Sequence, residues 1–190
     1  FEKSDIILKV ANISEEDVSF IKNKSILIGQ FDPILNKDKI NKLIAKDIKI
    51  FSLNLLPRIT RAQSMDVLSS QANLAGYKAV IESFSKFEKA IPMMMTAAGT
   101  ISPAKVLVIG AGVAGLQAIA TAKRMGAIVF ATDVRTASKE QVESLGGKFI
   151  MVEGSENLET EGGYAKEASD SFKEKQEALS ILMTSSILGK

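Results

Sequence analysis

The 190-residue chain contains no cysteine and no histidine. Without cysteine it can form no disulfide, thiolate nucleophile, iron–sulfur cluster or cysteine-ligated zinc site. Without histidine it also lacks the imidazole that zinc hydrolases, Ser-His-Asp triads and the usual dehydrogenase proton donors require. We therefore predict no metal site, and any chemistry here either moves no proton or uses Asp, Glu, Lys or Tyr to move it.

The charges of the chain are nearly balanced, with 24 Lys and Arg residues against 22 Asp and Glu residues and a net charge of +2. This balance gives no electrostatic reason to expect nucleic acid or an anionic membrane surface as a partner. The hydrophobic share of 46% and the charged share of 24% are typical of globular domains, so we expect the chain to fold around a core.

A stretch without any charged residue, 106–122, could be mistaken for a membrane helix. Its 17 residues fall short of the roughly 20 that cross a bilayer, and three of them are glycine, so we reject that alternative. No charged leader with an apolar core follows Phe1, so we expect no signal peptide. Because the chain does not begin with Met, we expect a piece of a longer protein.

Apolar runs alternate with amphipathic ones in two regions of the chain. We expect a β-α-β-α-β unit over residues 6–53 and a second alternating unit from residue 105, because short strands separated by helical crossovers form parallel sheets covered by helices. The predicted fold class is α/β, with two doubly wound, Rossmann-like units, both incomplete. A long helix, from about Asp66 to Ala90, is expected to join them.

Local signals mark the ends and faces of the predicted helices. Ser14 and Asp17 have the spacing of a capping box, Asn36 and Ser138 are expected N-caps, and Gly126 and Gly146 are expected just after helix ends. We expect apolar helix faces formed by Ile40, Leu43 and Ile44, and by Leu74, Tyr77, Ile81 and Phe84.

Three further segments carry weaker signals. The triple Met93–Met95 is expected to serve packing or linkage, and the polar stretch 153–163 to be a mobile loop. A helix from about Tyr164 to Ala178 is expected to fray at its end, because the connection to an apolar stretch at 181–184 is too short for a parallel crossover.

A G-x-G-x-x-G motif at Gly110, Gly112 and Gly115 follows an apolar strand and opens a helix. A second strand then ends at Asp133, 23 residues after the first glycine. In a dinucleotide-binding βαβ unit, Gly110 would permit the tight turn, Gly112 would let the backbone approach a pyrophosphate, and Gly115 would let the helix pack closely. The phosphates would lie at the positive end of the helix, with the adenosine ribose on Asp133.

The charge near Asp133 bears on which nucleotide is bound. A carboxylate at this position repels the 2′-phosphate of NADP and therefore favours NAD, whereas Arg135 leaves NADP open. The alternative for the whole motif is an incidental glycine turn in another kind of α/β domain.

A polar loop before the long helix contains Arg58, Gln63 and Asp66, and Ser69 lies in the first turn of that helix. Taken by its residues alone, this segment is most simply a capped helix start with solvated charges.

Several runs of the sequence closely resemble the NAD(H)-binding α subunit of proton-translocating NAD(P) transhydrogenases, and together they cover most of the chain. They are residues 61–66 (RAQSMD), 70–77 (SQANLAGY), 93–99 (MMMTAAG), 111–124 (AGVAGLQAIATAKR) and 142–149 (VESLGGKF).

The resemblance implies roles for particular residues. It implies that Arg58, Gln63 and Asp66 hold the nicotinamide end of the nucleotide, with Ser69 close by. It implies that a mobile loop carries Tyr164, which folds over the bound nucleotide, although a partly exposed tyrosine at a helix start is an equal alternative. The implied contacts at the adenosine and phosphate end are Gly110, Gly112, Val113, Ala114, Gly115, Asp133, Val134 and Arg135.

These roles lead to a domain organisation. We expect a partial N-terminal α/β domain over 1–57, the nicotinamide-site loop and connecting helix over 58–98, and a truncated dinucleotide-binding domain over 99–190.

The reaction implied by the resemblance is direct hydride transfer between NADH and an NADP⁺ held by a partner subunit. No substrate group loses a proton, so no general base is required and the missing histidine is no obstacle. The site has to orient the two rings, about 3 to 3.5 Å apart. The expected cofactor is NAD(H). Expected partners are NADP-binding and membrane-spanning subunits and a second copy of the chain, on the cytoplasmic or matrix face of a membrane.

Two alternatives stay open. Alanine dehydrogenase shares this architecture, but that family's acid–base histidine is absent from the corresponding loop, residues 28–33 (IGQFDP). The other alternative is an inactive, truncated remnant that binds a nucleotide or nothing.

Overall fold

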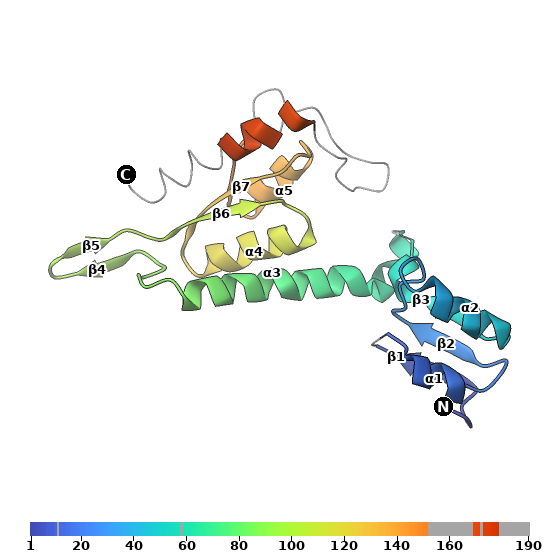
Figure 1. Ribbon diagram of the computed structural model, residues 1–190. Coiled ribbons are helices and arrows are strands. Elements are labelled where there is room, and N and C mark those ends of the chain that lie inside the picture. Colours follow the sequence, from blue (N-terminus) through green and yellow to red (C-terminus); the bar gives the residue numbers. More distant parts are fainter. Residues whose placement is uncertain (11, 58, 152–168, 172, 179–190) are drawn as a thin grey trace. The chain divides into compact units, whose positions relative to one another are not determined.

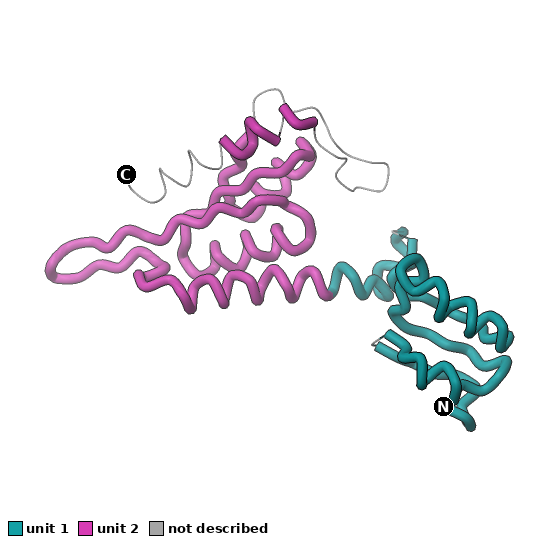
Figure 2. The backbone as a smooth tube through the Cα atoms, in the orientation of Figure 1, with its two compact units in different colours: residues 1–70 teal, residues 71–190 magenta. Residues whose placement is uncertain are grey.

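The computed structural model describes residues 1–10, 12–57, 59–151, 169–171 and 173–178 of the chain. The chain divides into two compact units, residues 1–70 (unit 1) and 71–190 (unit 2), which are coloured separately in Figure 2. Both units contain a three-stranded parallel sheet with helices between its strands, so the predicted α/β class is confirmed.

Unit 1 is the predicted β-α-β-α-β unit (Figure 1). Its three strands pair in parallel in the order β1-β2-β3, with Leu27 opposite Ile7 on one side and Ile50 on the other. The elements are β1 (Ile6–Lys9), α1 (Glu15–Phe20), β2 (Ile26–Gly29), α2 (Lys37–Ala45) and β3 (Lys49–Ser52).

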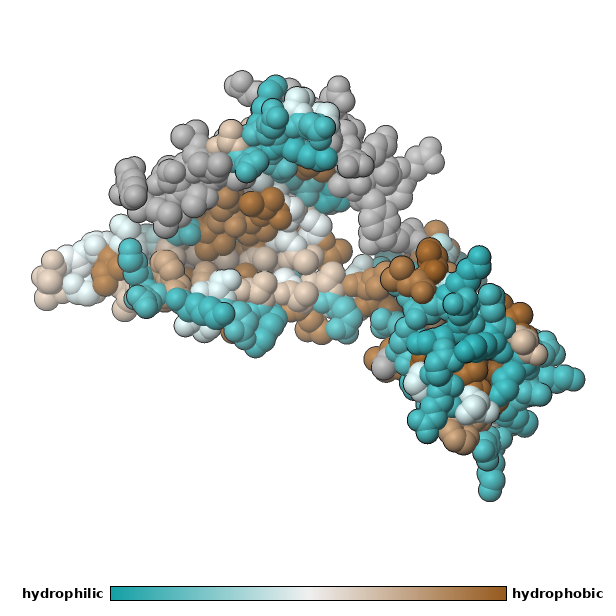
Figure 3. All heavy atoms as spheres, in the orientation of Figure 1, coloured by the Kyte–Doolittle hydropathy of each residue, from teal (hydrophilic) through white to brown (hydrophobic). Residues whose placement is uncertain are grey.

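The sheet of unit 1 has one buried face. Ile7 and Leu27 lie in a cluster with Phe31 and residues of both helices. The alternate positions point the other way and remain exposed, so Leu8 is 75% exposed. Burial also alternates along β2. Over α1 and α2 the outer surface is largely hydrophilic (Figure 3).

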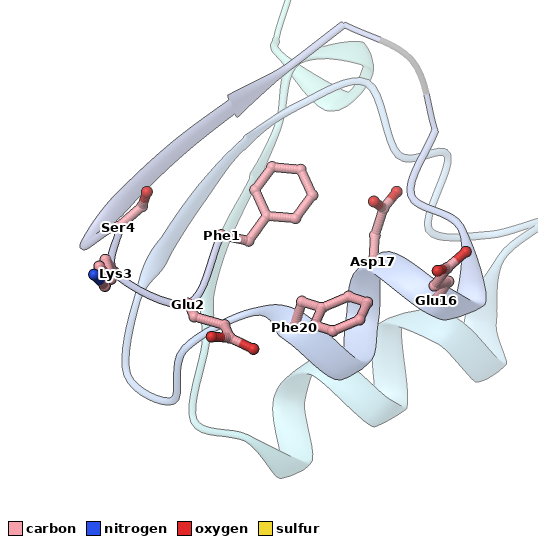
Figure 4. A pocket seen from close by; sticks show the side chains of 7 residues that line it. All are labelled: Phe1, Glu2, Lys3, Ser4, Glu16, Asp17 and Phe20. Atoms are coloured by element: carbon pink, nitrogen blue, oxygen red, sulfur yellow. The ribbon is translucent and has the colours of Figure 1, made fainter.

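The capping box predicted at the start of α1 is confirmed. The Asp17 amide donates to Ser14 Oγ at 3.0 Å, and the Ser14 amide donates to the Asp17 carboxylate at 3.0 Å. Lys9 also pairs with Asp17, and these hydrogen bonds together lower the pKa of Asp17 to about 2. A shallow hollow beside the box is lined by Phe1, Glu2, Lys3, Ser4, Glu16, Asp17 and Phe20, none of them a predicted site residue (Figure 4).

The other end of α1 is closed by a lysine from the end of α2. Lys46 Nζ donates to the carbonyl oxygens of Val18, Ser19 and Ile21 at 2.8, 3.0 and 2.8 Å. A cation there satisfies helix-end carbonyls and lies at the negative end of the helix dipole. It thereby ties the two helices of unit 1 together.

Two expectations for α2 are wrong in detail. Asn36 precedes the helix, but its side chain makes no capping bond. Its side-chain nitrogen Nδ2 donates instead to the carbonyl oxygens of Phe31 and Asp32 and closes the preceding loop. Of the predicted apolar face, Leu43 is buried and Ile40 is partly buried, while Ile44 is 59% exposed.

The long helix is present as α3 (Val67–Ser85), after two short 3₁₀ turns, η1 (Leu53–Leu55) and η2 (Thr60–Met65). The predicted end at Ala90 is wrong. The amides of Lys86 and Phe87 bond to carbonyls three residues back, which tightens the chain and ends the helix.

The buried face of α3 agrees with the prediction only in part. Phe84 packs partly buried against the core of unit 2, as expected, but the buried residues are Gly76 and Val80, and Leu74 and Tyr77 are 58% and 49% exposed. A Cβ on Gly76 would lie 2.0 Å from the Ala114 carbonyl oxygen, so this glycine permits a close helix–helix approach. The periodicity of large apolar residues could not show this, because the contact is made by a residue without a side chain.

Around Met93–Met95 the structure has a β-hairpin where packing or a linker was expected. Strand β4 (Met94–Thr96) pairs antiparallel with β5 (Gly99–Ile101), and every residue of both strands is exposed (Figure 1). Thr96 Oγ1 donates to Gly99 O at 2.9 Å and Gly99 adopts a φ of 133°, which together form the turn.

The sheet of unit 2 has the order β6-β7-β8, all parallel. Val129 and Ala131 of β7 are buried against Ile119 and Val142 of its helices. The elements are β6 (Lys105–Ile109), α4 (Val113–Arg124), β7 (Ile128–Thr132), α5 (Ser138–Ser144) and β8 (Lys148–Phe149).

The helix ends of unit 2 follow the prediction except at the start of α5. Gly126 and Gly146 have φ values of 88° and 77° after α4 and α5, as expected of helix-terminating glycines. Ser138 is not an N-cap: it is the buried first residue of α5, and Ala137 precedes it without a side-chain capping bond. Strand β8 is short, with two residues.

Near the C-terminus, residues 170–171 and 173–178 are helical. The predicted loop at 153–163, the start of the helix at Tyr164 and the stretch at 181–184 lie outside the described residues. Among the residues that the structure does describe, no helix has both the length and the apolar character of a membrane span.

Candidate functional site

The glycine-rich turn of unit 2 connects β6 to α4. Gly110 has a φ of 92°, a conformation that side-chain-bearing residues rarely adopt. Its amide donates to Thr132 O at 2.8 Å, so the turn is attached to the end of the neighbouring strand β7. Gly112 then precedes α4 as its N-cap residue, without a side chain that could cover the first helical amides.

The other two glycines of the motif have opposite surroundings. A Cβ on Gly115 would lie 1.8 Å from the Gly110 carbonyl oxygen, so the first turn of α4 packs directly on the backbone of the glycine-rich turn. At Gly112 the nearest atom to such a Cβ is Arg135 Nη2, 4.0 Å away. The turn is therefore tightly packed at Gly115 and open at Gly112. An open backbone at a helix N-terminus suits a phosphate group.

Asp133 follows β7 and is connected directly to this turn. Its Oδ2 accepts a hydrogen bond from the Ala111 amide at 2.6 Å. Its Oδ1 accepts bonds from the Arg135 amide at 2.8 Å and from Arg135 Nε at 2.9 Å, and Arg135 Nη2 donates to Oδ2 at 3.0 Å. The side chain of Asp133 is only 5% exposed.

The charge state of Asp133 follows from these contacts. Burial by itself raises the pKa of this carboxyl, but the hydrogen bonds from Arg135 and Ala111, with the Arg135 charge, outweigh burial and lower the pKa below its ordinary value. Asp133 is therefore ionised at neutral pH, and both of its oxygens accept hydrogen bonds.

A second group of predicted residues lies together in unit 1. Gln63, Asp66 and Ser69 line a pocket of about 380 Å³ where η2 meets the start of α3. Its other lining residues are Leu56, Pro57, Ile59, Ala62 and Ser70. Apolar walls with a few convergent polar groups are typical of a small-molecule site.

Within this pocket Asp66 caps the start of α3. Its Oδ1 accepts from the Ser69 amide at 2.9 Å and its Oδ2 from Ser69 Oγ at 2.7 Å, while Ser70 Oγ donates to Asp66 O at 3.1 Å. The interpretation of this segment as a capped helix start is thus confirmed. The implied contact with a nicotinamide stays a prediction, and the cap holds Asp66 and Ser69 in fixed positions for it.

The structure thus places the predicted site residues in two groups, one in each unit. Gln63, Asp66 and Ser69 share the pocket of unit 1. Gly110, Gly112, Gly115, Asp133 and Arg135 gather at the turn of unit 2, where Val113 and Ala114 begin α4 and Val134 separates Asp133 from Arg135. Arg58 and Tyr164 lie outside the described residues.

Two contacts made by Asp133 at the turn were not anticipated from the sequence. The Ala111 amide anchors Asp133, and Arg135 engages both oxygens of that carboxylate. The spacing of Asp133 and Arg135 was a visible signal for the second contact, whereas a backbone amide leaves no signal in the sequence.

Comparisons with known proteins place the chain in a family. Residues 1–75 match the family model described as alanine dehydrogenase/PNT, N-terminal domain, and residues 79–189 match alanine dehydrogenase/PNT, C-terminal domain. Over 181 residues the chain is 54% identical to an NAD(P) transhydrogenase alpha-subunit chain of Rhodospirillum rubrum, a match that covers 92% of this chain and 47% of that one.

Two solved structures have a similar fold. A transhydrogenase from Sinorhizobium meliloti is 56% identical with a TM-score of 0.75, over 80% of this chain and 46% of that chain. An L-alanine dehydrogenase, 16% identical with a TM-score of 0.62 over 78% of this chain and 42% of that chain, shows the fold alone. The chain spans about half the length of these relatives.

The packing of the glycines predicts different outcomes for two alanine substitutions. Gly115→Ala forces the turn away from α4, so we expect it to lower the free energy of unfolding by roughly 1–3 kcal/mol, as overpacking does. Gly112→Ala meets open space and should change that free energy by less than about 1 kcal/mol. Urea unfolding followed by circular dichroism measures both, and equal destabilisation by the two variants would contradict this account of the turn.

Proposed function

The chain belongs to the alanine dehydrogenase/PNT family, as its sequence runs predicted, and from this premise we propose that it is the NAD(H)-binding portion of a proton-translocating NAD(P) transhydrogenase. In this role it presents NADH for direct hydride transfer to an NADP⁺ that a partner subunit holds. The identity of 54% to a transhydrogenase subunit from Rhodospirillum rubrum supports this choice within the family.

The observation that carries the proposal is the junction of Asp133 with the glycine-rich turn. The bond of 2.6 Å from the Ala111 amide holds an ionised carboxylate beside the open backbone of Gly112. An acceptor for ribose hydroxyls therefore lies next to a helix N-terminus suited to phosphates, which is the pair of features that an adenosine diphosphate group requires. The residues present fit NAD(H).

At the nicotinamide end we propose that Gln63 and Asp66 bind the carboxamide and ribose, with Ser69 beside them and Arg58 anchoring the loop or the nucleotide. The pocket of unit 1 supports this assignment, because its polar groups lie among apolar walls on a capped helix start. Tyr164 would then cover the bound nucleotide.

In the proposed reaction these residues have to orient the nicotinamide ring. NADH supplies the hydride when bound, and no proton has to be removed from a hydroxyl or amine. Amide, carboxylate and hydroxyl groups can fix the angle and distance of a ring without titrating during the reaction. The absence of histidine from the chain is compatible with this task.

That absence also argues against the amino-acid oxidoreductase alternative. Oxidation of an amine requires an acid–base group, and the loop proposed for it, 28–33, contains Gln30 and Asp32 but no histidine. Phe31 of this loop is buried in the core of unit 1.

We further propose that the chain works in a membrane complex, with an NADP-binding subunit, a membrane-spanning subunit and a second copy of itself. By itself it would bind nucleotide without completing the reaction. The exposed hairpin of β4 and β5 supports self-association, because Met94, Met95 and Ile101 present 47%, 82% and 43% of their surface to solvent.

Binding of NADH can be followed by the enhancement of its fluorescence in this tryptophan-free chain. Asp133→Ala removes a charged acceptor and should weaken binding about tenfold or more, while Gln63→Ala removes a neutral hydrogen bond and should weaken it up to about tenfold. Exposed residues provide matched controls, Asp38→Ala and Gln141→Ala, which should leave binding unchanged. No binding by the unaltered chain would favour an inactive remnant instead.

Transfer of the hydride itself can be traced with an isotope. When the chain is combined with an NADP-binding partner subunit and given NADH that carries deuterium in both C4 positions, one deuterium should appear in NADPH without dilution by solvent protons. Mass spectrometry of the product measures this. Deuterium lost to water would exclude direct transfer, and reduction of NAD⁺ by alanine would point to the other enzyme of the family.

Self-association through the hairpin can be tested by placing a charge on it. Met95→Asp places a charge on its most exposed apolar side chain and should shift the chain from dimer to monomer in light scattering after gel filtration. Met125→Asp, at the end of α4, is the control and should leave the dimer intact. A monomeric unaltered chain would refute self-association.

A further inference from the structure

The carboxylate of Asp133 is fully engaged by groups of its own chain. Oδ1 accepts hydrogen bonds from the amide and Nε of Arg135. Oδ2 accepts hydrogen bonds from the Ala111 amide and from Nη2 of Arg135, and all four distances are 2.6–3.0 Å. A carboxylate offers about four acceptor positions. A ribose diol can therefore bond to Asp133 only by replacing one or more of these four donors.

The donors differ in how easily they can leave. The two amides belong to the backbone of the turns that hold Asp133, and losing them would dismantle the site. The guanidinium of Arg135 is on a long side chain, 17% exposed, and can rotate away. Arg135 is consequently the group that an incoming ribose displaces.

The location of the guanidinium shows what it would meet. Its Nη2 lies 4.0 Å from the position of a Cβ on Gly112, on the open side of the glycine-rich turn. It thus lies between the carboxylate of Asp133 and the helix start where phosphates are expected. That is the space in which the adenosine ribose of a bound dinucleotide must lie.

We propose that Arg135 is the residue that sets how strongly this site discriminates NAD(H) from NADP(H), an inference that rests on the proposed function. For NAD(H), the guanidinium competes with the ribose diol for Asp133 and weakens binding. For NADP(H), the same guanidinium offers planar, charged donors to the 2′-phosphate and offsets its repulsion by Asp133. Arg135 therefore reduces the preference for NAD(H) over NADP(H) that Asp133 alone would produce.

The test compares the dissociation constants of NADH and NADPH, measured by fluorescence at one ionic strength. Arg135→Gln should bind NADH several-fold more tightly and NADPH roughly tenfold more weakly, because a competitor for the diol and a partner for the phosphate are removed together. Arg135→Lys keeps the charge without the planar fork and should give a ratio between the two. Arg124→Gln, at the exposed end of α4, is the matched control and should leave both constants unchanged.

The direction of the two changes separates this role from a structural one. If Arg135 only supported the fold, both nucleotides would bind more weakly, and that result, or an unchanged ratio, would overturn the inference. Melting curves identify any variant that fails to fold. If Arg135→Gln does not fold, the ratio of the two dissociation constants in Arg135→Lys decides between the two roles. An unaltered chain that binds neither nucleotide would overturn the proposed function as well, whereas NADH binding with an unchanged ratio would overturn only the role of Arg135.

Discussion

The candidate site of unit 2 depends on a contact between two backbones, that of Gly115 against the carbonyl of Gly110. Any Cβ at Gly115 would lie 1.8 Å from that oxygen, so the glycine is what allows α4 to begin where it does. The position of α4 in turn defines the turn at Ala111, whose amide holds Asp133. The anchoring of the Asp133 carboxylate and the open backbone of Gly112 thus both depend on this close approach.

In the pocket of unit 1, the residues that cap a helix also face the proposed nicotinamide site. Asp66 and Ser69 close the start of α3 through two hydrogen bonds, and both side chains also line the pocket. A capping group that also bound a ligand would be oriented before the ligand arrived, which reduces the entropy lost on binding. Such rigidity suits the proposed reaction, in which the protein positions rings and transfers no proton.

Much of this architecture could be predicted from the sequence, because its signals are local. The capping box of Ser14 and Asp17, the glycines after α4 and α5, and the strand–turn–helix context of Gly110 all rest on short-range physics. The predictions failed where a partner distant in the sequence decided the outcome. Leu74 and Tyr77 were expected on the inner face of α3, but close packing of Gly76 on Ala114 selected another face.

Other features left a weaker signal. The β4–β5 hairpin was missed because its strands have three residues each and no polar alternation. Asn36 was assigned as a helix cap because of its type, yet its side-chain nitrogen donates to the carbonyls of Phe31 and Asp32 and its side chain accepts no bond from the helix. The pairing of Arg135 with Asp133 could be suspected from their spacing, but spacing does not indicate that the guanidinium bonds to both carboxylate oxygens.

The half-covered sheet of unit 1 has a consequence for the dynamics of the protein. Parallel sheets are ordinarily buried on both faces, whereas here Ile6, Leu8 and Phe51 are 59%, 75% and 56% exposed. Each apolar side chain left in water forgoes roughly 25 cal/mol per Å² of stabilisation. Among the described residues β2 is hydrogen-bonded to a strand on each side, whereas β1 and β3 are each paired on one side, so we expect the backbone amides of β1 and β3 to exchange with solvent before those of β2.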